Sequence, residues 1–92
     1  GDNHDICAII GGYVLDIVER KSKKGKFCIL TLESNYEFIN VIVFSELYSE
    51  YEEFLQSSKG NLLLVDGYIQ WDKWKEEYCL MTNLNTSFTV LS

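Results

Sequence analysis

The 92-residue sequence lacks long apolar runs. Its uninterrupted apolar stretches, such as Leu62 to Val65, are a few residues long, whereas a membrane-spanning helix needs about 20. We therefore expect no transmembrane helix and no membrane partner. The first residues also lack the basic and then apolar pattern of a secretory signal, so a cytoplasmic location is expected.

Cysteine and histidine are scarce. The three cysteines, Cys7, Cys28 and Cys79, are odd in number, far apart and without a C-x-x-C pair. This spacing is typical neither of a disulfide framework nor of a zinc site. Because their neighbours are apolar, we expect three reduced thiols, some or all of them buried. A catalytic cysteine would need a histidine, and the single one, His4, lies in the expected N-terminal tail.

Common catalytic motifs are also missing. The sequence contains no P-loop, G-x-S-x-G or H-E-x-x-H pattern, and its carboxylates are scattered. We expect no catalysis by these residues, no metal, no cofactor and no small-molecule substrate. The chain is nevertheless 47% hydrophobic, with six Tyr, five Phe and two Trp, so it has the apolar area that disordered segments lack. Its length suits one small folded domain, which excludes most enzyme architectures.

Strand patterns dominate the first half of the chain. Alternating apolar residues predict strands from Ile6 to Arg20, Phe27 to Glu33 and Glu37 to Phe44. The paired glycines Gly11 and Gly12 predict a bulge or a sharp bend within the first strand. Polar turns are expected from Lys21 to Lys26, with Gly25 at a positive φ angle, and from Ser34 to Tyr36.

The period then changes to that of a helix. From Ser45 to Gln56 apolar residues recur at spacings of three and four, with Ser45 as the expected N-cap. Two further strands are predicted from Asn61 to Trp71 and from Glu76 to Thr82. This order of elements predicts an all-β protein with small α content, a five-stranded Greek-key barrel of the OB-fold class with its helix between strands three and four. An α+β sandwich of similar order is the alternative.

The expected organisation has three parts. Residues 1–5 are an N-terminal tail or a remnant of cloning, residues 6–82 are an OB-fold nucleic-acid-binding domain, and residues 83–92 are a C-terminal tail or an edge strand. The net charge of −6 is distributed very unevenly over this chain. The segment from Arg20 to Lys26 holds five of the eight basic residues and no acidic one. The rest of the chain therefore has three basic residues against 14 acidic ones, a net charge of −11.

OB-folds bind single-stranded nucleic acid across strands two and three, between the loop joining strands one and two and the loop joining strands four and five. Cations neutralise phosphates, and aromatic rings stack on bases. The candidate nucleic-acid-binding residues are of three kinds: the basic side chains of the loop between strands one and two, two phenylalanines on the outer face, and the aromatic and basic side chains of the loop between strands four and five. They are Arg20, Lys21, Lys23, Lys24, Lys26, Phe27, Phe38, Trp71, Lys73, Trp74 and Lys75. The alternatives are a solvated turn or a protein contact for the basic loop and a structural role for the two Trp side chains.

Four segments occur in an order that resembles a known family. They are Ile10-Gly11-Gly12-Tyr13-Val14, then Lys21-Ser22-Lys23-Lys24-Gly25-Lys26 running into Leu30-Thr31-Leu32-Glu33, then Val41-Ile42-Val43-Phe44-Ser45-Glu46-Leu47-Tyr48, then Leu62-Leu63-Leu64-Val65-Asp66-Gly67. This series resembles the OB domain near the C-terminus of the bacterial DNA polymerase III α subunit. The resemblance covers Ile6 to about Thr82.

The resemblance implies a parent chain that is a DNA-directed DNA polymerase, a nucleotidyltransferase whose catalytic carboxylates lie in another domain. It implies that this module lies near the single-stranded template and beside regions that engage the sliding clamp and the clamp loader. We therefore expect an accessory domain that binds single-stranded DNA weakly and non-specifically. A protein-docking module of the replisome without DNA contact and an anticodon-type RNA-binding OB domain are the alternatives.

Overall fold

The computed structural model describes residues 6–91, which form six strands and one helix. The strands are β1 (Ile6–Ser22), β2 (Gly25–Ser34), β3 (Glu37–Val43), β4 (Leu62–Asp72), β5 (Glu77–Met81) and β6 (Phe88–Val90), and the helix α1 spans Ser45–Gln56. The predicted tail of residues 1–5, with His4, lies outside the described residues, as does residue 92. The predominance of strands and the single helix between β3 and β4 are confirmed.

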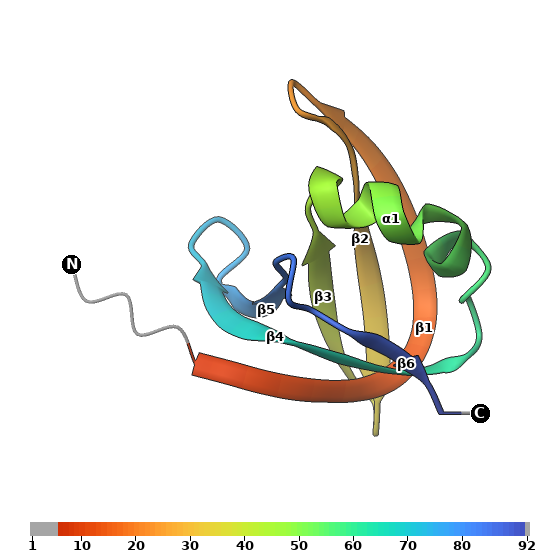
Figure 1. The fold of residues 1–92 in the computed structure, drawn as a ribbon. Coiled ribbons are helices and arrows are strands. Elements are labelled where there is room, and N and C mark those ends of the chain that lie inside the picture. Colours follow the sequence, from red (N-terminus) through yellow and green to blue (C-terminus); the bar gives the residue numbers. More distant parts are fainter. Residues whose placement is uncertain (1–5, 92) are drawn as a thin grey trace.

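Five strands close into a ring of hydrogen-bonded neighbours (Figure 1). The pairs β1–β2, β2–β3 and β4–β5 are antiparallel, whereas β3 and β5 are parallel. The ring is completed by β1 and β4, which pair antiparallel along Ile6 to Tyr13. The short strand β6 lies within the segment expected to be a tail or an edge strand, and it adds to β4 at Leu63 to Val65.

β1 contributes to both halves of the ring because it changes partner at its middle. Its residues pair with β4 up to Tyr13 and with β2 from Tyr13 onward. Gly12 lies at this crossover, where a Cβ atom would be 2.9 Å from the carbonyl oxygen of Glu33. The bulge expected at the paired glycines occurs slightly later, between Val14 and Asp16. Gly12 is therefore needed because β1 approaches β2 closely at this point. The bulge is a separate feature, which lies between Val14 and Asp16 further along β1.

The helix boundaries are as predicted, but its N-cap is not. The capping residue is Phe44, which makes no side-chain capping hydrogen bond. β3 ends at Val43, one residue earlier than expected, so Ser45 already belongs to the helix. α1 lies across the end of the ring nearest the β1–β2 turn (Figure 1).

The core fills the ring beneath α1. The alternation predicted for the second and third strands is confirmed, because Leu30 and Val41 are fully buried while Ile29 and Ile42 on the opposite face are half-buried. The helix adds three buried side chains, Leu47, Tyr48 and Leu55. Within residues 6–91 no helix has the length and apolar character that crossing a membrane requires.

Candidate nucleic-acid interface

The predicted basic loop is the end of the β1–β2 hairpin. Both strands extend further than expected, so the turn itself contains Lys23 and Lys24. The Ser22 hydroxyl donates to the carbonyl oxygen of Gly25 at 3.0 Å and accepts the Lys24 N–H at 3.2 Å. Gly25 has a φ angle of 121°, as predicted, which residues with a Cβ rarely adopt. The two turn lysines are thus held at the tip of a well-defined hairpin.

The other basic residues divide between the two faces of this hairpin. Arg20 is opposite Phe27, and Lys21 is opposite Lys26. Directly opposed residues of antiparallel strands share a face, and successive residues alternate. Arg20 and Phe27 therefore lie on the outer face of the ring, whereas Lys21 and Lys26 continue the face of the buried Cys28.

Lys26 is engaged by two carboxylates. Its Nζ atom lies 3.0 Å from Oε2 of Glu52 in α1 and 4.0 Å from Oε1 of Glu19. The hydrogen bond to Glu52 and the charge of Glu19 raise the pKa of Lys26. Glu19 also accepts a hydrogen bond from the Tyr48 hydroxyl at 2.7 Å. Lys26 therefore links the hairpin to the helix, a role that the sequence alone did not reveal.

Lys23 and Lys24 border a hollow of about 370 Å³ at the outer end of the hairpin. Its aromatic lining comes from Phe27, which is half-buried, and from Phe44, which is 44% exposed. Lysines beside exposed rings suit single-stranded nucleic acid, because the cations attract phosphates while the rings stack on bases. Phe44 is missing from the residues predicted for the site. The alternation of the third strand could have identified Phe44, because it places this residue on the same face as Ile42.

The outer face continues from this hollow along β3 to β5. Ile42 lies two residues before Phe44, about 7 Å along an extended strand. Beyond it the Thr31 hydroxyl donates to Oδ1 of Asn40 at 3.1 Å, and the Asn40 amide donates to Oε2 of Glu77 at 3.5 Å. These hydrogen bonds connect β2, β3 and β5, so the middle of the face is polar, and the Thr31 hydroxyl and the Asn40 amide each already donate to a neighbour.

The β4–β5 turn borders a second hollow, of about 300 Å³, that also includes Ile42. Asp72 shapes this turn, since its Oδ1 atom accepts the N–H groups of Trp74 at 2.9 Å and Lys75 at 3.1 Å. Trp74 is 93% exposed and therefore does not cap the ring. Trp71 packs edge-on against Tyr78 with the ring centroids 4.9 Å apart. Lys73 and Trp74 line the hollow together with Trp71, whereas Lys75, the fourth predicted residue of this loop, does not.

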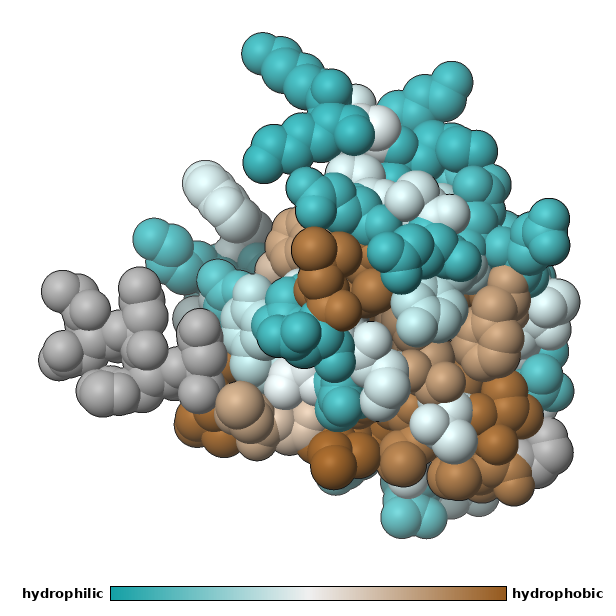
Figure 2. Space-filling view, in the orientation of Figure 1, coloured by the Kyte–Doolittle hydropathy of each residue, from teal (hydrophilic) through white to brown (hydrophobic). Residues whose placement is uncertain are grey.

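Two carboxylates outside the predicted set belong to this hairpin: Asp72 lines the second hollow, and Glu77 is its partner on β5. Asp72 and Glu77 are directly opposed in the β4–β5 hairpin. Burial raises the pKa of the Cys79 thiol, the two carboxylates raise it further, and Lys75 lowers it. The β4–β5 half of the face is therefore mixed in charge, whereas hydrophilic side chains extend from the β1–β2 hairpin at the other end (Figure 2). The register of the β4–β5 hairpin could have identified these two acidic residues, because it places them side by side.

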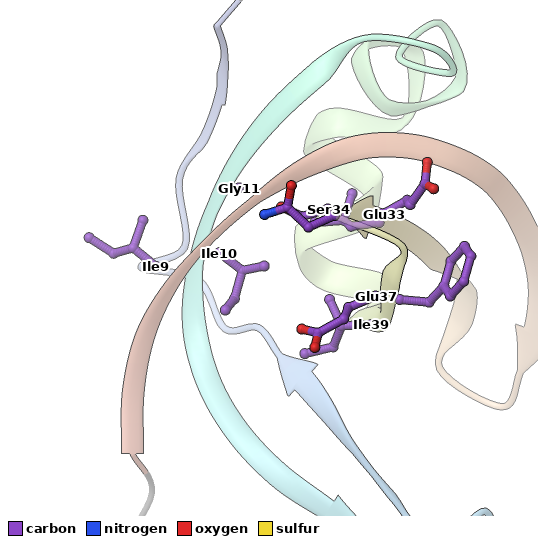
Figure 3. Close-up of a pocket in the computed structure, with 10 residues that line it drawn as sticks. Ile9, Ile10, Gly11, Glu33, Ser34, Glu37 and Ile39 are labelled. Carbon is purple, nitrogen blue, oxygen red and sulfur yellow. The ribbon is translucent and has the colours of Figure 1, made fainter.

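Phe38 is separated from the other predicted residues. It lies on the outer face, but opposite Glu33 near the β2–β3 turn, about 20 Å along β2 from the level of Phe27. It is 61% exposed and borders a third hollow, together with Ile9 and Ile39 (Figure 3). Six of the eleven predicted residues thus line the two hollows, namely Lys23, Lys24, Phe27, Trp71, Lys73 and Trp74. Arg20, Lys21, Lys26, Lys75 and Phe38 line neither.

Thiols and carboxylates form no metal centre in the part of the chain that the structure describes. Within residues 6–91 no three His, Cys, Asp or Glu side chains are grouped to hold an ion. The cysteines are free, with Cys28 and Cys79 buried and Cys7 exposed, in agreement with the predicted thiols. Burial, assisted by the charge of Glu19, raises the pKa of Cys28 to about 12, which makes a nucleophilic thiolate unfavourable.

Comparisons with known proteins leave the family open. No protein-family model matches the sequence. No curated protein matches it either. The resemblance to the polymerase family therefore depends on the four sequence segments quoted above alone.

Proposed function

We propose that this chain is an OB-fold domain that binds single-stranded DNA weakly and without sequence preference. The closed strand order β1-β2-β3-β5-β4, with a helix between β3 and β4, supports the fold. The observation that carries the function is the hollow in which Lys23 and Lys24 meet Phe27 and Phe44. The resemblance to the polymerase family adds the proposed setting, a replicative polymerase whose catalytic residues lie in another domain.

The proposed path runs from the first hollow to the second. Phosphates contact Lys23, Lys24 and Arg20, while a base stacks on Phe44. The strand then passes Ile42 and reaches the second hollow beside the exposed Trp74. Stacking on rings accepts any base, so this path favours binding without sequence readout.

Weak affinity follows from the charges along this path. The carboxylate of Asp72 lines the second hollow, and that of Glu77 lies opposite it on β5, so both repel phosphate there. In the middle of the face, the amide of Asn40 is hydrogen-bonded to Glu77 rather than presented to a base. The net charge of −6 adds a long-range repulsion that salt screens only in part.

Fluorescence anisotropy with a labelled thymidine oligonucleotide, at about 20 mM and about 200 mM salt, tests the proposal. The K23A/K24A variant should lose at least about tenfold in affinity at low salt, and its salt slope should fall by about 1.4 because two phosphate contacts are removed. The matched control is K26A/K59A, which removes the same charge from a lysine already paired with Glu52 and from a lysine outside the hairpin. We expect the control to lose less than about threefold.

Absent binding at low salt, or equal losses in both double variants, would contradict the proposal. A uridine oligonucleotide provides the comparison with RNA, since preference for it would favour the anticodon-type alternative. Protein docking is the remaining candidate, favoured by the exposed carboxylates of Glu46, Glu50 and Glu53 along α1. It gains support if neither oligonucleotide binds.

A further inference from the structure

The half of β1 that pairs with β4 has an open edge on its other side. Residues 6–12 pair with β4, whereas pairing with β2 begins at Tyr13, so among the described residues no strand is paired to the second edge of this segment. An open edge offers backbone N–H and C=O groups to an incoming strand. The segment from Ile6 to Leu15 contains no charged residue and no proline, which are the features that usually block strand addition.

A hollow of about 370 Å³ lies beside this edge (Figure 3). Its apolar lining is formed by Ile10 on β1, by Ile39 on β3 and by the buried Leu32. Ile9 points away from this space and is 67% exposed. Side chains of an extended segment alternate in direction. An added strand would therefore place one apolar side chain in the hollow and leave the next beside Ile9.

The rim of the hollow is acidic. Glu33 and Glu37 line it, and none of its ten lining residues is basic. A second copy of the chain would bring the same carboxylates to this rim, and the net charge of −6 also opposes self-association. A cationic segment matches both the rim and the overall charge. Charge complementarity therefore favours a basic partner over a second copy.

We propose that the open edge of β1 and this hollow bind an extended, cationic segment of a partner protein by strand addition. Backbone hydrogen bonds to residues 6–12 hold the segment, one apolar side chain fills the space between Ile10 and Ile39, and Lys or Arg side chains lie beside Glu33 and Glu37. The surface is separate from the proposed DNA path, whose lysines are at the opposite end of the β1–β2 hairpin.

A fluorescein-labelled peptide of about eight alternating lysine and valine residues is the probe for fluorescence anisotropy. The full chain should bind it saturably, and the E33K/E37K variant should bind at least about tenfold more weakly. The matched control is E50K/E53K, which changes the net charge equally on exposed positions of α1 and should lose less than about threefold. Circular dichroism checks that both variants remain folded.

A change in the peptide makes the test independent of the protein variants. Replacing a central valine by proline removes a backbone donor, so strand addition predicts at least a tenfold loss of affinity. The K23A/K24A variant should bind the peptide within about threefold of the parent chain, which distinguishes this surface from the DNA path.

Four results would overturn the proposal. They are absent saturation with the lysine–valine peptide, equal losses in E33K/E37K and E50K/E53K, unchanged binding of the proline peptide, and a loss of peptide binding in K23A/K24A. A dimer in sedimentation velocity that the Ile9→Lys substitution abolishes would assign the edge to a second copy instead.

Discussion

Replacing Gly12 by alanine tests how the ring is closed at the crossover of β1. The added Cβ would lie 2.9 Å from the carbonyl oxygen of Glu33 and 3.1 Å from Cβ of Leu32. Neither atom can rotate away, because both are fixed by the backbone of β2. Overpacking of this kind costs about 1–3 kcal/mol, while alanine lowers the entropy of the unfolded chain and returns about 0.4–1 kcal/mol. The midpoints of these ranges give an expected net loss of about 1.3 kcal/mol.

The neighbouring glycine is the matched control. A Cβ at Gly11 would meet only Cδ1 of Leu64, at 3.4 Å, which is the flexible end of a side chain. The gain from the unfolded state should then dominate, and the Gly11→Ala variant should be between unchanged and about 1 kcal/mol more stable.

Urea unfolding followed by tryptophan fluorescence measures both variants against the parent chain. We expect the midpoint of Gly12→Ala to fall at an unchanged m value, and that of Gly11→Ala to stay or rise. A Gly12→Ala variant as stable as the parent, or two variants with equal losses, would refute the close approach of β1 and β2 at this point.

Three further predictions concern the site and the core. Phe44→Ala should weaken oligonucleotide binding by about 1–3 kcal/mol, whereas Phe38→Ala should leave it within about twofold, and anisotropy titrations of the two variants decide this. Burial, with a hydrogen bond to a carboxylate, raises the pKa of Tyr48 from 10.0 to about 12. As the pH rises from about 10 to about 12, the Tyr48 hydroxyl loses its proton in the unfolded chain before it does so in the folded one. The contribution of this hydroxyl to stability is therefore complete below pH 10 and is lost over that range. The urea midpoint of Tyr48→Phe should accordingly fall less between pH 10 and 12 than that of the parent chain. In native buffer Ellman's reagent should modify the exposed Cys7 rapidly and Cys28 only on unfolding, and Cys7→Ser should remove the fast phase.

The local elements were predictable because their signals are short-range. Helical spacing defined Ser45–Gln56, and alternation identified the core positions of β2 and β3. The end of β1 was placed too early and the start of β2 too late, because a polar, lysine-rich segment resembles a turn even where it continues a hairpin. The N-cap was assigned to Ser45 on side-chain chemistry, although the structure ends β3 at Val43 and begins the helix with that serine.

The site was less predictable because it depends on contacts between distant segments. The ion pairs of Lys26 with Glu19 and Glu52 join three elements, and no local pattern indicates them. The charges of Asp72 and Glu77 become part of the candidate path only once β4 and β5 are paired. Composition showed that the bases are concentrated in one loop, but the register of the hairpin decides which of them face the outer side of the ring.

The most direct test of the central claim is a chemical-shift titration of the uniformly labelled chain with a short thymidine oligonucleotide. We expect the largest shifts at Lys24, Phe27, Ile42, Phe44 and Trp74, which line the two hollows of the outer face. Residues of the β1–β4 half, such as Ile9, should not shift. Shifts concentrated on that half, or none at low salt, would contradict the proposed interface.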